Sequence, residues 1–249
     1  MKIGAQLYTI REFTKNTADF ATSMKKIADI GYQYVQVSGI GADIPIKEVA
    51  DICASNGLEI VVTHTNPTKI RDEVASVIED HRIMGAKYVG IGAMPAEYER
   101  NIDGVKKFIA DYTPAVDALK QAGMMFMYHN HDFEFEKYGS KLMIEHLKDD
   151  FPIGFILDTY WVQAAGGDPA AWITKFSGRI PVIHFKDMSW ANGSKRMAEV
   201  MEGNLNWQSI FAACPGAGVD YAMVEQDDCN GKDPFESLRL SFNNLKEAL

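Results

Sequence analysis

The sequence has little of several features that would assign it to a specialised class of protein. Only three of its 249 residues are cysteines (Cys53, Cys214 and Cys229), and they form no closely spaced pair of the kind that binds zinc. A disulfide framework is therefore not expected, which suits a reducing compartment. No segment approaches the roughly 18 uninterrupted apolar residues of a membrane span, and the N-terminus enters a strand-like run without a signal-peptide pattern. We expect a cytoplasmic protein with no membrane partner.

Positive charge is also scarce. The chain has 25 lysines and arginines against 34 aspartates and glutamates, a formal net charge of −9. Without a basic cluster, such a surface repels phosphate backbones, so nucleic acid is not expected as a partner. A glycine-rich phosphate loop is absent as well, because the first strand-like run leads into Leu7-Tyr-Thr-Ile-Arg-Glu-Phe. This absence disfavours an open doubly wound sheet, which normally carries such a loop after its first strand.

What the sequence does have is a regular alternation of short β-rich runs and amphipathic helical stretches. Runs such as Phe155-Ile-Leu are continuously apolar, which is typical of strands buried on both faces. The predicted strands are 2–9, 34–39, 59–65, 88–94, 124–131, 154–160, 181–188 and 221–227. The predicted helices are 17–30, 46–56, 69–84, 101–122, 140–148, 169–176, 206–213 and 234–248. Eight strand–helix units without a linker favour one (β/α)8 TIM barrel, a single domain over residues 1–249.

Polar residues gather where the last four predicted strands end, which in a parallel barrel is the face that carries the active site. Asp158, His184 and Glu225 each follow two or three apolar residues, and Glu134 lies a little past the fifth strand. Three carboxylates and one imidazole from four consecutive strand ends suit one divalent cation, with room left for a substrate. The sequence therefore predicts a metal site at Glu134, Asp158, His184 and Glu225, which would accept Mn²⁺, Mg²⁺, Co²⁺ or Zn²⁺.

Other polar side chains near the strand ends are candidates for contact with a substrate. His129 and His131 share one face of the fifth strand, and either could replace or support Glu134 as a metal ligand. Each candidate also has a structural alternative. The histidines could be hydrogen-bonded structural residues, Trp161 could pack at the barrel rim, and Lys186 could be an exposed lysine at that rim. His81 and His146 fall within helical stretches and are expected to face solvent or a helix cap. The predicted substrate-binding residues are His64, His129, His131, Trp161 and Lys186.

Four ordered motifs, at residues 128–135, 157–161, 184–187 and 224–227, read Tyr-His-Asn-His-Asp-Phe-Glu-Phe, Leu-Asp-Thr-Tyr-Trp, His-Phe-Lys-Asp and Val-Glu-Gln-Asp. Together with Gly-Asn-Leu-Asn-Trp at residues 203–207, they make nearly the whole chain resemble the sugar phosphate isomerase/epimerase-like family with the xylose isomerase-type TIM barrel. The resemblance implies a Mn²⁺-like ion held by Glu134, Asp158, His184 and Glu225. It also implies that Glu134 and Glu225, on opposite sides of a bound sugar, move a proton next to a carbonyl. A cation that stabilises the resulting enediolate would make the protein a sugar isomerase or epimerase.

The sequence leaves three other functions open. The same proton abstraction can drive β-elimination, as in a lyase or dehydratase of an oxidised sugar such as an inosose or 3-keto-glycoside. A zinc-dependent abasic-site endonuclease would need a histidine-rich cluster and a basic surface, and the chain is acidic with six histidines. A non-catalytic sugar-binding scaffold would lack a metal ligand, and none of the four is missing. No phosphate-binding segment follows the last two strands, which favours a non-phosphorylated sugar. A homo-oligomer or a partner subunit could close the site.

Overall fold

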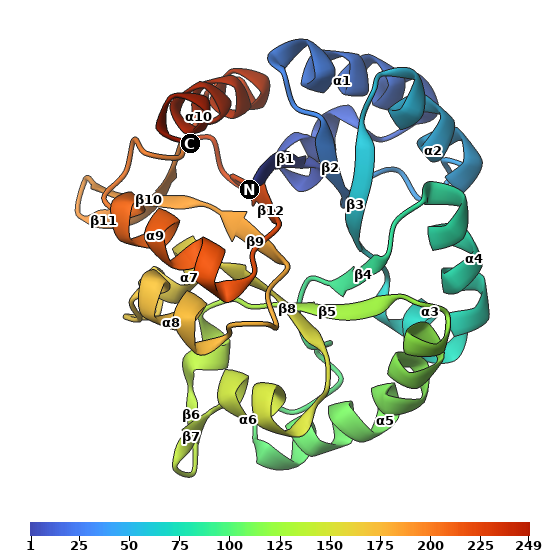
Figure 1. Cartoon of the computed structure of the whole chain (residues 1–249), viewed down its shortest axis with the longest axis vertical. Helices are drawn as coiled ribbons and strands as arrows, with labels where there is room; N and C mark the ends of the chain where they lie inside the picture. Colours follow the sequence, from blue (N-terminus) through green and yellow to red (C-terminus); the bar gives the residue numbers. More distant parts are fainter.

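Eight parallel strands close into a barrel in the computed structural model, which describes residues 1–249 (Figure 1). Around the barrel the strands follow the order β1-β12-β9-β8-β5-β4-β3-β2. The predicted (β/α)8 fold is therefore confirmed. The strands are β1 (Lys2–Gln6), β2 (Tyr34–Val37), β3 (Glu59–His64), β4 (Tyr88–Ile91), β5 (Met125–His129), β8 (Gly154–Asp158), β9 (Val182–Phe185) and β12 (Tyr221–Val224).

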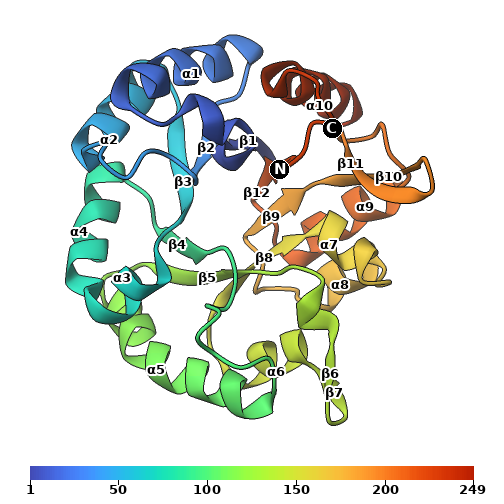
Figure 2. The ribbon, with the colours of Figure 1, turned by 180° about the vertical axis from the view of Figure 1, so that it is seen from behind.

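Helices surround the barrel on its outside, as the two opposite views show (Figures 1 and 2). Each predicted helix has a counterpart, although the stretch 69–84 is divided in two at Glu73. None of the helices is long and apolar enough to cross a membrane. The helices are α1 (Thr17–Ile30), α2 (Ile46–Ser55), α3 (Pro67–Asp72), α4 (Val74–Met84), α5 (Ile102–Gln121), α6 (Met143–Asp150), α7 (Thr159–Ala164), α8 (Pro169–Lys175), α9 (Trp207–Ala217) and α10 (Pro234–Ala248).

The structure contains several short elements that the sequence pattern did not predict. A 3₁₀ helix, η1 (Leu7–Phe13), ends the first strand at Gln6, whose side chain accepts a hydrogen bond from the Tyr8 amide. A second 3₁₀ turn, η2 (Phe133–Phe135), follows β5. Two antiparallel hairpins complete the chain: β6 (Lys137–Tyr138) with β7 (Lys141–Leu142), and β10 (Asp187–Ala191) with β11 (Ser194–Ala198).

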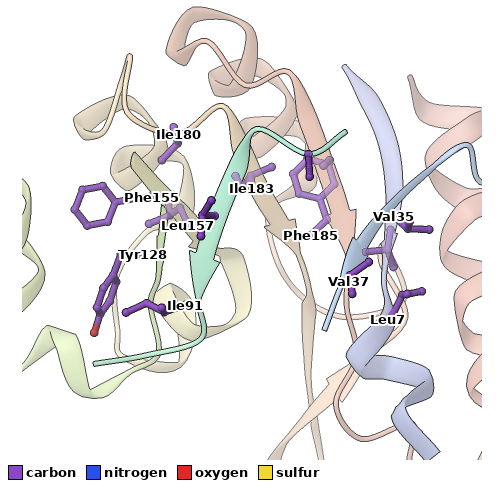
Figure 3. Packing of buried hydrophobic residues seen from close by; sticks show 14 of the residues in the cluster. Leu7, Val35, Val37, Ile91, Tyr128, Phe155, Leu157, Ile180, Ile183 and Phe185 are labelled. Atoms are coloured by element: carbon purple, nitrogen blue, oxygen red, sulfur yellow. The ribbon is translucent and has the colours of Figure 1, made fainter. Parts of the chain in front are cut away.

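The barrel strands are buried on both faces, and the two faces belong to different apolar clusters. The larger cluster lies between strands and helices and includes Tyr128, Phe155 and Leu157 (Figure 3). A separate cluster of seven residues fills the barrel interior. Because side chains alternate along a regular strand, a residue two positions after an interior residue also points inward. The interior cluster consists of Val61, Val62, Tyr88, Met127, Ile156, Val182 and Met223.

The Gly-Asn-Leu-Asn-Trp segment is fixed to the barrel by one buried carboxylate. Both oxygens of Asp187 accept hydrogen bonds, from the main-chain N–H groups of four residues and from the indole N–H of Trp207. At Gly203 an added Cβ would collide with the Asp187 carboxylate, so the close approach requires glycine. This motif is therefore explained by packing of the loop before α9. The four main-chain donors belong to Met188, Met201, Gly203 and Leu205.

Candidate metal centre

Strand alternation brings five polar side chains to one mouth of the barrel. Each lies two positions after an interior apolar residue: His64 after Val62, for example, and Asp158 after Ile156. This periodicity is the physical reason that residues far apart in sequence converge at the carboxyl ends of the strands. The other three are His129, His184 and Glu225.

Four of these residues form a compact group of potential metal ligands. One ligand atom from each of His129, Asp158, His184 and Glu225 lies within 4.8 Å of the others, and all four side chains are buried. Buried carboxylates are costly unless they are paired with positive charge. The group contains three of the four residues that the sequence predicts and has His129 in the place of Glu134.

The hydrogen bonds of the two histidines fix which ring nitrogen of each faces the group. His129 Nδ1 donates to the Gly92 carbonyl at 2.9 Å, so its Nε2 lone pair points toward Asp158 Oδ2, 3.3 Å away. His184 Nε2 donates to Gln36 Oε1 at 2.8 Å. Its Nδ1 is buried without a hydrogen-bond partner and lies 3.0 Å from Glu225 Oε2.

An imidazole nitrogen lone pair that faces a carboxylate is repelled by it unless positive charge lies between the two groups. Here this holds for both histidines. Such histidines, oriented by a hydrogen bond from the second ring nitrogen, are the usual ligands of a transition metal. Burial lowers the pKa of His184, but the carboxylates of Glu225 and Asp158 more than offset burial and raise this pKa to about 9. The site therefore attracts a cation, either a proton or a metal ion, and its residues fit a divalent metal.

Lys186 places a second positive charge beside the ligand group. Its ammonium lies 2.5 Å from Asp227 Oδ2, 3.3 Å from Glu225 Oε2 and 3.8 Å from Asp158 Oδ2. Burial lowers the pKa of Lys186, yet these carboxylates reverse that effect and hold the pKa above its ordinary value. The side chain is only 1% exposed. The alternative of a solvated rim lysine is therefore wrong.

Glu134 does not belong to the ligand group and does not line the cavity that opens onto it. Its Oε1 accepts a hydrogen bond from the Tyr128 hydroxyl and its Oε2 from the His131 amide, both at 2.7 Å. Tyr128 belongs to the outer cluster between strands and helices, so this carboxylate is directed outward. Burial raises the pKa of Glu134 to about 7, against the opposing effect of these two hydrogen bonds.

A polar cavity of about 360 Å³ opens onto the ligand group, which we call the metal-site cavity. Among the predicted substrate-binding residues, His64, His129, His131 and Lys186 line it. Trp161 does not line it, although its ring lies over Lys186, with Nζ 5.2 Å from the ring centroid. The cavity also includes Asp227, the last residue of the Val-Glu-Gln-Asp motif, and four residues that the sequence pattern did not single out: Tyr8, Arg11, Ser38 and Gly92.

The two further histidines in the metal-site cavity are held neutral. Burial lowers the pKa of His131 to about 3 and that of His64 well below its ordinary value, with neighbouring histidines adding to the effect. His131 Nδ1 and His64 Nε2 are both buried without a partner in the protein. Neutral imidazoles with an unpartnered nitrogen are suited to hydrogen-bond a hydroxyl-bearing ligand.

Tyr8 and Arg11 enter the metal-site cavity from η1. The Arg11 guanidinium donates to the main-chain carbonyls of Tyr8 and Asp227 and lies over the Tyr8 ring, 4.4 Å from its centroid. Their placement depends on the 3₁₀ turn that follows β1. The signal that could have found them is their position just after the first strand, where a barrel places functional residues.

Comparison with solved structures supports this architecture. A sugar phosphate isomerase/epimerase from Parabacteroides distasonis is 24% identical, with a TM-score of 0.83 over 99% of this chain and 98% of that chain. An L-ribulose 3-epimerase is 15% identical, with a TM-score of 0.75 over 100% and 95% of the two chains. The probable 3-DHS dehydratase AsbF from Bacillus anthracis is 15% identical, with a TM-score of 0.72 over 99% of each chain. At these identities the likeness shows the fold alone.

No curated protein sequence matches the chain significantly. The model of one protein family, described as the xylose isomerase-like TIM barrel, matches residues 24–242. That match covers most of the chain and includes the whole ligand group. The protein therefore belongs to the xylose isomerase-like TIM barrel family.

Proposed function

We propose that the protein is a metal-dependent sugar isomerase or epimerase that moves a proton at the carbon next to a substrate carbonyl. The observation that carries the proposal is the arrangement of His129 and His184, whose second ring nitrogens face buried carboxylates at the base of a polar cavity. A hydroxyl-rich molecule suits this cavity, since its lining offers hydrogen-bond donors and acceptors and a single hydrophobic residue.

His129, Asp158, His184 and Glu225 would hold the ion. A bound divalent cation supplies electrostatic stabilisation of the negative charge that develops on the substrate oxygens when the carbon loses its proton. Two imidazoles and two carboxylates favour Mn²⁺, Co²⁺ or Zn²⁺ over Mg²⁺, which prefers oxygen ligands. We retain Mn²⁺ as the proposed ion.

Within the chain, Glu225 is the group best placed to take the proton. It lines the metal-site cavity, and its Oε1 is oriented by a hydrogen bond from Gln6 Nε2 at 2.7 Å. Lys186, beside it, is placed to hold a substrate hydroxyl or a developing oxyanion. The strand opposite β12 in the barrel is β4, flanked by β3 and β5. His64 ends β3 and His131 follows β5, so their neutral rings would hydrogen-bond the far side of the sugar while solvent water returns the proton there.

Glu134 receives a different role from the one that the family resemblance implies. Both of its oxygens are engaged and the side chain is fully buried, so it would reach a substrate only if both hydrogen bonds broke. We propose that Glu134 positions the His129-Asn-His segment through the His131 amide. It would act through those residues and without touching the sugar.

Proton exchange with solvent tests this function directly. The Mn²⁺-loaded protein is incubated with D-fructose and other ketohexoses in D₂O, and NMR follows loss of the C–H signal next to the carbonyl. We expect deuterium incorporation and an epimer or aldose product, both abolished in Glu225→Gln. A protein that binds Mn²⁺ and sugar but exchanges no proton would contradict the proposal.

The second candidate is a lyase or dehydratase of an oxidised sugar. It uses the same proton removal, followed by loss of a group from the adjacent carbon, and one solved structure of the same fold is named a probable dehydratase. Incubation with 3-keto-glycosides and inososes separates the two. Release of an aglycone or water, without epimer, would favour the lyase.

The proposed setting is a cytoplasm in which the enzyme acts on a small sugar. All three cysteines are free thiols, and two of them, Cys53 and Cys214, are buried. Free cysteines are common where glutathione keeps thiols reduced. Fractionation of cells that express the tagged full chain would test this location.

A further inference from the structure

A second cavity lies beside the metal-site cavity and takes no part in the proton transfer described above. It measures about 530 Å³ and is lined by Tyr160 of α7, by residues 194–197 of β11, and by Asp228 and Asn230. We call it the hairpin cavity. Asp228 directly follows Asp227, which lines the metal-site cavity. The Tyr160 ring centroid lies 5.8 Å from Lys186 Nζ. The two cavities are therefore neighbours, with the Lys186–Tyr160 contact between them.

An exposed tryptophan stands on the side of the hairpin that faces this cavity. Trp190 pairs with Lys195 across the β10–β11 ladder, and Met188 pairs with Met197. Residues paired in an antiparallel ladder project from the same face. Lys195 lines the hairpin cavity and its Nζ reaches the Ala164 carbonyl of α7, so Trp190 shares the hairpin face that lies toward α7 and borders the cavity beside Lys195. With 65% of its surface exposed, Trp190 is the most exposed large hydrophobic residue in the chain.

The polar groups of the hairpin cavity include both donors and acceptors. Lys195 and Arg196 are paired with no carboxylate, and Lys195 Nζ donates only to the Ala164 carbonyl, at 3.2 Å. Asp228 accepts through Oδ1 from the Asn230 amide, which leaves its Oδ2 available. Hydroxyl groups both donate and accept, and the C–H face of a sugar ring packs on an indole. An anion would meet the Asp228 carboxylate.

From this arrangement we propose that the hairpin cavity is a subsite for a second sugar ring, with Trp190 as its stacking platform. The ring is joined to the ketose whose carbonyl lies in the metal-site cavity, so the substrate class is a two-ring saccharide or glycoside. This inference rests on the proposed function for the placement of the reacting ring. Lys195, Arg196 and Asp228 hydrogen-bond the hydroxyls of the second ring.

Paired ligands test the subsite. D-fructose and isomaltulose, a fructose that carries a glucose ring, are titrated into the Mn²⁺-loaded protein, with calorimetry and tryptophan fluorescence as readouts. We expect isomaltulose to bind more tightly than fructose by about fivefold or more, the effect of one stacked ring, and to quench Trp190. Trp190→Ala should remove that advantage and leave fructose and Mn²⁺ affinity unchanged. Trp190→Phe should keep part of it.

The control is Ile83→Ala, which removes an exposed apolar side chain on α4 and should change neither affinity. Equal affinity of the wild-type protein for the two sugars would overturn the subsite and leave the proposed function standing. Failure of both sugars to bind the Mn²⁺-loaded protein would overturn the ketose assignment and the subsite with it. Quenching of Trp190 by inorganic phosphate and not by isomaltulose would show an anion site, which contradicts a second sugar ring.

Discussion

Gln36 Oε1 accepts a hydrogen bond from His184 Nε2 at 2.8 Å, and this contact between β2 and β9 determines which nitrogen of His184 faces the carboxylates. Because this contact holds a proton on Nε2, Nδ1 is the nitrogen that faces Glu225 and Asp158 and is available to a metal ion. A side chain that orients a metal-binding histidine in this way also makes it a better ligand.

Removal of this orienting contact should weaken metal binding. We expect Gln36→Ala to lower Mn²⁺ affinity by about 10- to 100-fold, the usual effect of losing such a partner. Gln33→Ala, an exposed glutamine just before the same strand, serves as the matched control. Isothermal titration of metal-free protein measures both. Equal affinity for Mn²⁺ in Gln36→Ala and wild type would show that His184 needs no such orientation.

Removal of the Lys186 charge should have opposite effects on metal binding and turnover. The ammonium lies 3.3 Å from Glu225 Oε2 and competes electrostatically with a cation at the ligand group. Lys186→Gln should therefore tighten Mn²⁺ binding, while deuterium exchange into a ketose falls by about 100-fold or more through loss of oxyanion stabilisation. Weaker Mn²⁺ binding in Lys186→Gln would mean that the lysine supports the metal site structurally. Lys175→Gln, on the surface, is the control.

Glu134 should make the stability of the fold depend on pH. Burial raises its pKa from the ordinary 4.5 to about 7, so between these values the native state holds a proton that the unfolded chain has released. The protonated Glu134 therefore makes its full contribution to the free energy of unfolding below about pH 4.5. This contribution is lost as the pH rises through 7.

Urea unfolding of wild type and Glu134→Gln, in EDTA from pH 5 to 8, measures this loss. The wild type should lose up to roughly 3 kcal/mol relative to the variant across that range. Glu136→Gln, an exposed neighbour, should track the wild type. Parallel pH profiles for wild type and Glu134→Gln would contradict a raised pKa and with it the outward, buried placement of this carboxylate.

Asp187 should be essential for stability and not for metal binding. Its carboxylate satisfies five donors, three of them buried, and Asp187→Ala would leave those three without a partner at a cost of at least about 3 kcal/mol. Asp187→Asn, which keeps one acceptor oxygen, should lose less. Chemical unfolding checks the order, with the exposed Asp43→Ala as control. A stable Asp187→Ala protein with impaired Mn²⁺ binding would instead place Asp187 in the site.

Much of the site could be predicted because the ligands obey a period of two. Asp158, His184 and Glu225 each follow an interior apolar residue by two positions, which directs them inward whatever the loops do. The direction of Glu134 has no such basis. It depends on the η2 turn and on Tyr128, whose ring belongs to the outer cluster. Sequence spacing does not contain that information.

Other features were missed for reasons of tertiary packing. His81, expected to face solvent or a cap, is buried and bonds the Thr63 hydroxyl through Nε2, because α4 packs against β3 at that point. His146 is half-buried and donates to the Tyr138 carbonyl. The β10–β11 hairpin had a local signal. Asn192 and Gly193, both at positive φ, form the Asn-Gly pair that commonly marks a two-residue hairpin turn.

The most direct measurement is a crystal structure of the protein grown with excess Mn²⁺, with anomalous scattering used to locate the ion. We predict one strong peak bound by His129 Nε2, Asp158, His184 Nδ1 and Glu225, with Glu134 still hydrogen-bonded to Tyr128. A structure with no peak at this mouth of the barrel, or with Glu134 bound to the ion and His129 turned away, would contradict the account.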